Sequence, residues 1–578
     1  MDRRTFLSSS ALLSAMHMAG PRAALAALPE SGDGLTFVSR SAQGWCIPRP
    51  MYWSFDNRDP RIEMAGYSFS FQVFTYGKIE NNFSLDGKSI LLKQEGNRWT
   101  LHASRLSWPG QQRAAEGTFQ AEVVLEGDRV LLHTQATAME DIRGIKVRIH
   151  RLPRASFAYT GWQVTSNFAP VTHDGVTYNY PSYVGGMPVW FLGSETRGIA
   201  FSSLGVTPTP KRFGAQLLAD GIEAELIVEQ DASQLSPRFT APAWELRRNT
   251  TLEAAINARM RLLEEKAGLK RWEDRNDVAP WARKIDLVVT LHGMHWSGYI
   301  FNNYGDMLDA VRWVTDRIDG QRVLFFLAAW EGRYYRQYGD SRADEQMGGA
   351  DGLRRLVAFA HARGAHVMAM FGGNGSDPRL PGFEQWGATS TTSSLHELPG
   401  EIDWSRMRGY RVDWAEIRAG VSEGAWLSLA APAWRNHLIE QVDGLNATYG
   451  FDGNFFDTQP DEGMPALADA LRSRKPDLLL ATEGWFDLSL ASTPMSQTLD
   501  GPLGWSSRYQ RRFAHLSLGE PSRGSTGVHE LGFVPYNLPD LLESFNLPTV
   551  SFVENTYQTA PQAVEAVIRA AKNRVPVG

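Results

Sequence analysis

The fold of this chain is decided by residues 434–458, which read WRNHLIEQVDGLNATYGFDGNFFDT. The first part mixes apolar and charged residues as an amphipathic helix does, and a short apolar run typical of a buried strand follows Gly450. A helix that leads directly into a buried strand is half of a β/α repeat. This strand ends on an acid, Asp457, where the apolar run stops.

The same alternation extends to both sides of this stretch. Strand-like runs occupy 284–293, 322–330, 366–374, 451–458 and 478–485, with helix-like runs at 306–318, 351–364 and 466–476. Weaker strand candidates lie near 513–518, 532–535 and 548–553, and 558–575 predicts a closing helix. Alternating units with near-continuously apolar strands indicate a parallel sheet covered on both faces. We predict a (β/α)8 TIM-type barrel over residues 280–578. A doubly wound sheet is the alternative, and no G-x-G-x-x-G follows its first strand to support it.

The first half has a different texture, and the fold class is therefore multidomain β + α/β. Short alternating runs separated by Gly, Asp and Asn turns fill residues 35–250, for example YSFSFQVFTY at 67–76 and RVLLHTQATA at 129–138. Strands at such spacing are typical of a sandwich. Residues 251–272 have helical spacing. We predict an N-terminal β-sandwich with a linker helix over residues 35–270.

The first 26 residues resemble a twin-arginine export signal. Arg3 and Arg4 precede a short apolar stretch, and an A-x-A pattern ends at Ala26. Such a signal is removed from the mature protein and does not anchor it in a membrane. We therefore expect a periplasmic or secreted protein without stable membrane insertion.

Composition excludes several classes of function. The formal charge is −6, so no excess of basic residues points to nucleic acid. Cys46 is the only cysteine, which excludes an internal disulfide framework and a multi-thiolate zinc site. We expect no cofactor and no metal. The 19 tryptophans fill cores in most proteins, but an indole face also suits the apolar face of a sugar ring. The oligomeric state stays open.

Two acids end consecutive strands of the predicted barrel, Asp457 and Glu483. Chemistry in such barrels lies at the carboxyl ends of the strands. Neighbouring strands are about 4.8 Å apart, which allows two carboxyl groups to reach the roughly 5–5.5 Å of a retaining glycosidase. The structural alternative for Asp457 is that it caps the following helix.

Residues 428–459 resemble glycosidase-type barrels, distantly like the α-amylase and α-galactosidase types of glycoside hydrolase. The shared features are a small-Pro-x-Trp segment, an amphipathic helix, G-x-D-G and a strand that ends in Asp, with Glu-Gly at 483–484 on the next strand. The resemblance covers about residues 284–490 and matches Asp457 to the nucleophile and Glu483 to the acid/base. One departure is Phe455, where α-amylase-like enzymes carry arginine.

Further polar and aromatic residues follow the predicted strands and are candidate substrate-binding residues. They are His292, His295, Trp296, Trp330, Glu331, Arg333, Asn374, Gln459, Trp485 and Glu530. The spacing of His292 and His295 would also suit a metal pair, but no carboxylate completes a ligand motif. Glu530 is a second candidate acid.

The sequence predicts an exported glycoside hydrolase that cleaves an oligosaccharide or polysaccharide with two carboxyl groups, in a retaining reaction. Two alternatives remain. A periplasmic glycan-binding protein would keep the tryptophans without needing paired acids. A polysaccharide lyase would use a tyrosine or histidine base beside an arginine or asparagine that neutralises a carboxylate, for which Tyr334, Tyr335 and Arg336 are available.

Overall fold

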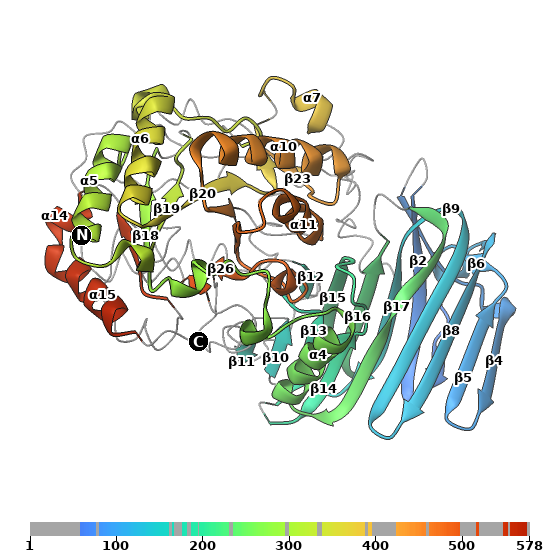
Figure 1. Ribbon diagram of the computed structural model, residues 1–578. Coiled ribbons are helices and arrows are strands. Elements are labelled where there is room, and N and C mark those ends of the chain that lie inside the picture. The colour runs from blue at the N-terminus through green and yellow to red at the C-terminus, as the bar shows by residue number, and fades with distance from the viewer. Residues whose placement is uncertain are drawn as a thin grey trace, which may run out of the picture. The chain divides into compact units, whose positions relative to one another are not determined.

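The structure is a computed structural model that describes residues 58–574 without 77–79, 156, 161–163, 167–175, 182–185, 195, 231–234, 295–299, 332–337, 378, 388–390, 396–423, 458–461, 498–515, 519–546 and 553–554. The chain divides into two compact units, Met1–Ala267 and Gly268–Gly578 (Figure 1). No helix in the described ranges is long and apolar enough to cross a membrane. The predicted export signal lies outside these ranges.

The first unit is a β unit, as the alternating pattern predicts. Its described strands join into one connected antiparallel sheet, comprising β1 (Ile62–Met64), β2 (Tyr67–Tyr76), β3 (Glu80–Leu85), β4 (Ile90–Glu95), β5 (Arg98–Ala103), β6 (Leu106–Ser107), β7 (Ala114–Ala115), β8 (Gly117–Glu126), β9 (Arg129–Leu152), β10 (Phe157–Thr160), β11 (Val164–Ser166), β12 (Val176–Tyr180), β13 (Val189–Gly193), β14 (Gly198–Ser203), β15 (Lys211–Leu218), β16 (Gly221–Glu229) and β17 (Ser236–Thr250). The hydrogen bonds therefore do not separate the two sheets that a sandwich predicts.

Strand β9 is the reason for this connection. It is 24 residues long, and its first half pairs with β8 and β17 while its second half pairs with β2 and β16. Alternate residues of the second half, such as Val147, enter the hydrophobic core. The opposite face is charged yet buried, and Lys146 Nζ lies 3.2 Å from Glu225 Oε1. A buried charge needs such a partner because it has lost its water.

A single long helix, α4 (Leu252–Lys266), follows the sheet. The Thr251 side chain accepts a hydrogen bond from Ala254 N–H and so caps the first turn. The helix ends six residues before the predicted end at 272. The reason is Gly268, whose φ of +68° is a left-handed conformation that an α-helix does not continue.

Seven of the predicted strands form, the predicted strand at 532–535 lies outside the described residues, and one strand at Met495–Gln497 was not predicted. The described part of the second unit thus contains eight parallel strands. They are β18 (Leu287–His292), β19 (Val323–Ala328), β20 (His366–Gly372), β24 (Gly453–Asp457), β25 (Leu479–Glu483), β26 (Met495–Gln497), β27 (Leu516–Leu518) and β28 (Thr549–Phe552). Their spatial order is β27-β26-β25-β24-β20-β19-β18-β28, so the last strand in the sequence pairs with the first. A pairing of β27 with β28 is not among those described.

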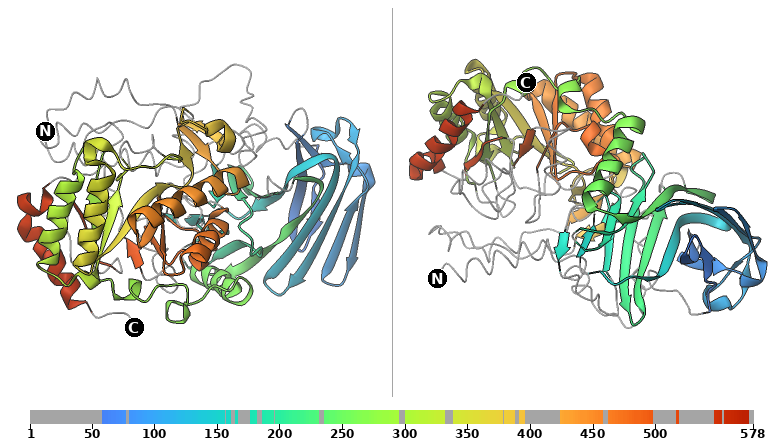
Figure 2. Two further views of the ribbon diagram at one scale, coloured as in Figure 1. Left: turned by 45° about the horizontal axis from the view of Figure 1, so that its top comes forward. Right: turned by 90° about the horizontal axis from the view of Figure 1, so that it is seen from below.

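Helices separate the successive strands from β18 to β25, two more follow β28, and they flank the strands (Figures 1 and 2). They are α5 (Tyr304–Thr315), α6 (Gly349–Ala362), α7 (Phe383–Trp386), α10 (Pro432–Tyr449), α11 (Met464–Arg474), α14 (Thr556–Thr559) and α15 (Pro561–Asn573). A small antiparallel sheet of β21 (Gly375–Ser376), β23 (Gly424–Leu427) and β22 (Thr391–Leu395) follows β20.

The stretch that decides the fold forms the expected helix and strand. Pro432 lies in the first turn of α10, and Gly450, at a φ of +82°, ends the helix. The amides of Asn446 and Asn454 exchange two hydrogen bonds of 2.9 Å in the buried space between α10 and β24. This pair fixes the helix against the strand that carries Asp457.

Asp452 lies at the opposite end of β24 and is a structural contact. Its Oδ2 accepts hydrogen bonds from His361 Nε2 at 2.8 Å and from Val367 N–H at 2.9 Å. Burial alone would raise the pKa of Asp452, but the hydrogen bonds from His361, His366 and Val367 outweigh burial and hold this pKa well below its usual value. Asp452 therefore binds β24 to β20 as a carboxylate.

Candidate active site

Asp457 and Glu483 are the last residues of two neighbouring parallel strands. In the β24–β25 register, Phe456 pairs with Thr482, so one further step along both strands places Asp457 opposite Glu483. Partners in a parallel ladder direct their side chains to the same face. Asp457 is buried with 4% exposure and Glu483 is half-buried. The two carboxyl groups thus share one level at the carboxyl edge of the sheet.

Tyr338 holds the Asp457 carboxylate. Its hydroxyl donates a 2.7 Å hydrogen bond to Asp457 Oδ2, and both side chains are buried. The tyrosine ring lies over Gly372, the β20 partner of Asp457, where an added Cβ would come within 2.0 Å of the ring. Ser376 Oγ donates to the Tyr338 carbonyl at 2.5 Å and fixes the backbone. Gly372 is therefore the residue that allows the phenol to reach Asp457.

The sequence did not single out Tyr338. Only the Gly-Gly pair at 372–373 gave a signal, since glycine at a strand end often marks a close approach of other groups. Which aromatic residue makes that approach is set by a segment far from the strand in the sequence.

The layers beneath Asp457 are apolar. Gly453, Phe455 and Asp457 share one face of β24, and the Phe455 ring packs 4.7 Å from the ring of Phe326 on β19. A Cβ at Gly453 would lie 3.1 Å from both Leu479 O and the Met368 side chain, so a larger residue would press on both neighbouring strands. Phe455 thus fills the space below the acid, and Gly453 allows the neighbouring strands to pack closely.

Glu331 is a third acid at this edge and follows β19. It is 1% exposed, and neither carboxyl oxygen has a hydrogen-bond partner in the part of the chain that the structure describes. Burial, with a smaller contribution from the charge of Asp457, raises the pKa of Glu331 to about 8. This side chain is therefore a neutral acid at pH 7.

The backbone before Glu331 is strained. Ala329 adopts a φ of +52°, in the left-handed region that costs a non-glycine residue free energy. Non-glycine residues in this region occur more often at active sites and ligand clamps. Strand β19 ends at Ala328, directly before this turn, and Trp330 and Glu331 follow the turn.

Trp330 lies in the core. It is fully buried, its indole N–H donates to Met370 O at 2.7 Å, and its ring meets Phe371 and Phe451 edge-on at 5.8 and 5.3 Å. Tyr304 Oη donates to the Trp330 carbonyl at 2.6 Å. In this structure the indole has no open face on which a sugar could stack.

His292 ends β18 and is also buried, with 1% exposure. Burial lowers the pKa of His292 to about 4, so the imidazole is neutral near pH 7. The ring meets Phe301 edge-on at 5.0 Å. Asn302 Nδ2 donates to His292 O at 2.7 Å and to Phe552 O at 2.9 Å, which connects the ends of β18 and β28.

Two further predicted site residues, Asn374 and Trp485, are described by the structure, and the rest lie outside the described ranges. Asn374 is buried, and its Nδ2 donates to Leu427 O at 3.1 Å, so it anchors the small sheet after β20. Trp485 is 8% exposed and follows Glu483 and Gly484. Predicted residues outside the described ranges are His295, Trp296, Arg333, Gln459 and Glu530, together with Tyr334, Tyr335 and Arg336 of the lyase alternative.

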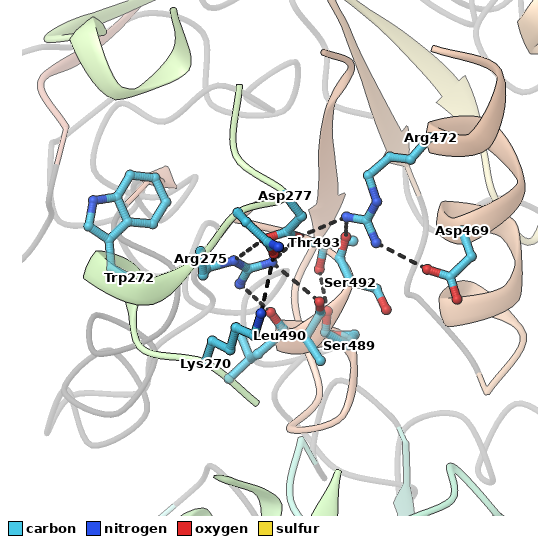
Figure 3. A network of polar contacts seen from close by, with 12 residues as sticks. Lys270, Trp272, Arg275, Asp277, Asp469, Arg472, Ser489, Leu490, Ser492 and Thr493 are labelled. Carbon is cyan, nitrogen blue, oxygen red and sulfur yellow. Dashed lines mark hydrogen bonds and ion pairs between the residues drawn. The ribbon is translucent and has the colours of Figure 1, made fainter. Parts of the chain in front are cut away.

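A network of charges holds the segment that follows β25 (Figure 3). Arg275 Nη2 lies 2.6 Å from Asp277 Oδ2, and its Nη1 donates to Leu490 O. Arg472 Nη1 donates to Asp277 Oδ2 at 3.0 Å and to Ser492 O at 2.6 Å. Burial alone would raise the pKa of Asp277, but the hydrogen bond and charge of Arg275 and the charge of Arg472 outweigh burial and lower this pKa. The segment after Glu483 is thus fixed by two arginines.

A metal site would need a cluster of ligands. Among the described residues, no group of three or more His, Cys, Asp or Glu side chains could hold a metal ion.

Comparisons with known proteins concern the fold. Searches against family models and curated proteins found no match. Among solved structures, α-N-acetylgalactosaminidase NagBb from Bifidobacterium bifidum matches with a TM-score of 0.54 and 14% identity over 77% of this chain and 76% of that chain. A quadruple mutant of NagBb gives 0.58 and 12% over 89% and 92%. The GH36 α-galactosidase AgaA from Geobacillus stearothermophilus gives 0.47 and 13% over 88% and 73%. In its fold, this chain is therefore similar to a solved glycosidase.

Proposed function

We propose that this protein is a glycoside hydrolase that uses Asp457 and Glu483. The observation that carries the proposal is their common level on neighbouring parallel strands. Strands about 4.8 Å apart bring two such carboxyl groups to the roughly 5–5.5 Å separation of a retaining mechanism. The fold likeness to a glycosidase supports the same reaction class.

The reaction proceeds in two steps. Asp457, as the carboxylate, attacks the anomeric carbon, and the bond to the leaving oxygen breaks as Glu483 gives that oxygen its proton. In the second step Glu483 takes a proton from water, and the water oxygen displaces Asp457 from the anomeric carbon. The Tyr338 hydroxyl supports Asp457 because it holds Oδ2 in one orientation and favours the charged form.

The substrate is an oligosaccharide or polysaccharide. The solved structure with a similar fold is named an α-N-acetylgalactosaminidase, which makes a terminal α-linked N-acetylgalactosamine the first substrate to test. Trp485, beside Glu483, is the described tryptophan closest in sequence to the proposed acid/base and our candidate for sugar contact.

We further propose that the strands of the second unit close into a (β/α)8 barrel over residues 280–578. The pairing of β28 with β18 supports this proposal, because a closed barrel requires the last strand to return to the first. For residues 35–270 we propose the two packed layers of a sandwich, with β9 crossing between them. Residues 1–26 are proposed to direct export to the periplasm or the medium.

The decisive experiment is a hydrolysis screen of the purified mature chain against α- and β-linked glycosides, including α-N-acetylgalactosaminides and α-galactosides. Expected is turnover of one class with retention of the anomeric configuration in the first-formed sugar, read by proton NMR. Binding of glycans without turnover would overturn the proposal of a glycoside hydrolase and would support a glycan-binding protein. An unsaturated sugar product, detected by its ultraviolet absorption, would identify a lyase instead.

A further inference from the structure

A pocket in the first unit is lined by three arginines. Its volume is about 580 Å³, and it lies where the ends of β9, β13, β14 and β17 meet. The arginines are Arg154, Arg197 and Arg248, and no acidic residue is among the described residues of the wall. The remaining wall consists of small, amide and apolar residues, namely Leu152, Pro153, Ala155, Leu192, Gly193, Ser194, Gly198, Ile199 and Asn249. The chain as a whole has a formal charge of −6, so its overall composition does not explain a pocket whose described charged residues are all arginines.

None of the three guanidinium groups forms an ion pair with a described carboxylate. Arg154 Nη2 donates only to backbone carbonyls, of Leu218 at 3.5 Å and Ala219 at 3.2 Å. Arg248 lies 5.7 Å above the Tyr67 ring, and its buried Nε has no hydrogen-bond partner among the described residues. Arg197 lies on an exposed hairpin, with its backbone N–H bonded to Ser194 Oγ at 3.2 Å.

Two described acids lie beside this part of the sheet without lining the pocket. Asp128 Oδ1 accepts a hydrogen bond from Asn249 Nδ2 at 3.0 Å, and Asp220 pairs with Arg151 at 3.2 Å, outside the pocket wall. Glu195, which follows Ser194 in the sequence, lies outside the described residues. The positive charge of three arginines around one pocket attracts an anion.

The backbone of the wall is shaped for close approach. Gly193 and Gly198 face each other in the β13–β14 register, and a Cβ on either would come within 2.4 Å of the opposite carbonyl. Asn249 adopts a left-handed φ of +52°, which turns β17 at the edge of the pocket. Because these glycines have no side chain, β13 and β14 can lie close together beside Arg197, which lines the pocket.

We propose that this pocket binds an oxyanion carried on a sugar, a carboxylate or a sulfate ester. A guanidinium group binds two oxygens of such an anion at once through its planar fork. The exposed and half-buried apolar residues of the wall, Pro153, Ala155 and Ile199, would receive the body of the sugar ring. The pocket residues belong to the first unit, whereas Asp457 and Glu483 belong to the second, and the proposal does not depend on the proposed function.

The test measures binding by isothermal titration calorimetry with the full mature chain. Probes are a sulfated monosaccharide, glucuronic acid, their uncharged parent sugars and free sulfate. The wild type should bind the two acidic sugars and not their neutral parents, and the affinity should fall with added salt. Arg197→Ala should weaken binding at least tenfold, because a charge-assisted bidentate contact is lost.

Arg151→Ala is the matched control, since Arg151 pairs with Asp220 and does not line the pocket, and it should leave the affinity unchanged. Arg248→Ala should also weaken binding. If Arg248→Ala does not fold, the result for Arg197→Ala alone decides the test. Equal binding by the wild type and Arg197→Ala, or no binding of acidic sugars, would overturn the site. Equal affinity for free sulfate and the sulfated sugar would overturn the role of the apolar wall.

Discussion

The Tyr338 hydroxyl donates a 2.7 Å hydrogen bond to Asp457 Oδ2, although the two residues are 119 positions apart in the sequence. One is on the segment after β19 and the other ends β24. The contact exists because Gly372, between them, has no side chain. A single missing methyl group therefore decides how the proposed nucleophile is held.

Tyr338→Phe should keep the ring over Gly372 and remove only the donor. A hydrogen bond to a charged group contributes about 1.5–3 kcal/mol, so kcat/KM should fall about 10- to 100-fold. Steady-state kinetics on the substrate found in the screen measure this loss. Gly372→Ala is the complementary change, and it should lower the unfolding temperature because its Cβ would meet the Tyr338 ring. Wild-type kinetics of Tyr338→Phe would contradict a role for the hydroxyl.

Asp457→Asn and Glu483→Gln should each abolish most activity. A lost general acid costs roughly 10²–10⁴-fold, and a lost nucleophile costs more. Asn keeps an acceptor for Tyr338, so the fold should remain close to that of the wild type, checked by circular dichroism. Azide should restore turnover of Asp457→Ala by giving a glycosyl azide of inverted configuration. Near wild-type turnover in both amide variants would place the site elsewhere.

The pH dependence of stability should report Glu331. Its pKa is raised from 4.5 to about 8 in the folded protein, so the folded state binds the proton more tightly than the unfolded state. Stability is then highest below the unfolded value and declines as the pH rises through about 8. Glu331→Gln keeps the neutral form, so its unfolding temperature should decline less between pH 5 and 8 in thermal melts.

The same variant separates this effect from other groups. His292 is neutral across this range, because its pKa is about 4, and Asp457 is the charged group that acts on Glu331. Glu331→Gln should therefore also retain activity at alkaline pH where the wild type loses it. Identical pH profiles of the two proteins would show that Glu331 does not titrate near pH 8.

Asp277→Asn should loosen the segment after β25. It removes the anion shared by Arg275 and Arg472, and the free energy of unfolding should fall by about 1–3 kcal/mol in urea titrations. The matched control is Asp469→Asn, which breaks the ion pair of Arg472 with a side chain that is 74% exposed. An exposed pair contributes about 0–1 kcal/mol, so the control should change little. Equal losses of unfolding free energy in both variants would show that Asp277 stabilises this segment no more than an exposed ion pair does.

Export can be tested in cells. Arg3→Lys combined with Arg4→Lys should leave unprocessed protein in the cytoplasm, because the twin-arginine route reads this pair. Fractionation and immunoblotting measure the result, with Arg22→Lys as a control outside the pair. Normal maturation of the double variant would reject the signal.

Much of the second unit follows from pattern alone. Apolar runs that stop at polar residues locate the strand ends, and β24 and β25 end on the two acids as expected. The orientation of Trp330 does not follow, because the left-handed Ala329 lies between the strand and the tryptophan. A pattern of residue types records no such turn, so an aromatic residue that reads as a site wall lies in the core.

The pairing of β28 with β18 sets the time at which the second unit can fold. Asn302, after β18, donates a hydrogen bond to Phe552 at the end of β28, 250 positions away, and the edge of β18 that pairs with β28 stays unpaired until β28 has been made. Contacts of such high sequence separation slow folding and prolong the exposure of strand edges. Until β28 has been synthesised, the exposed edge of β18 can pair with other chains, so this half of the protein is prone to aggregation during synthesis.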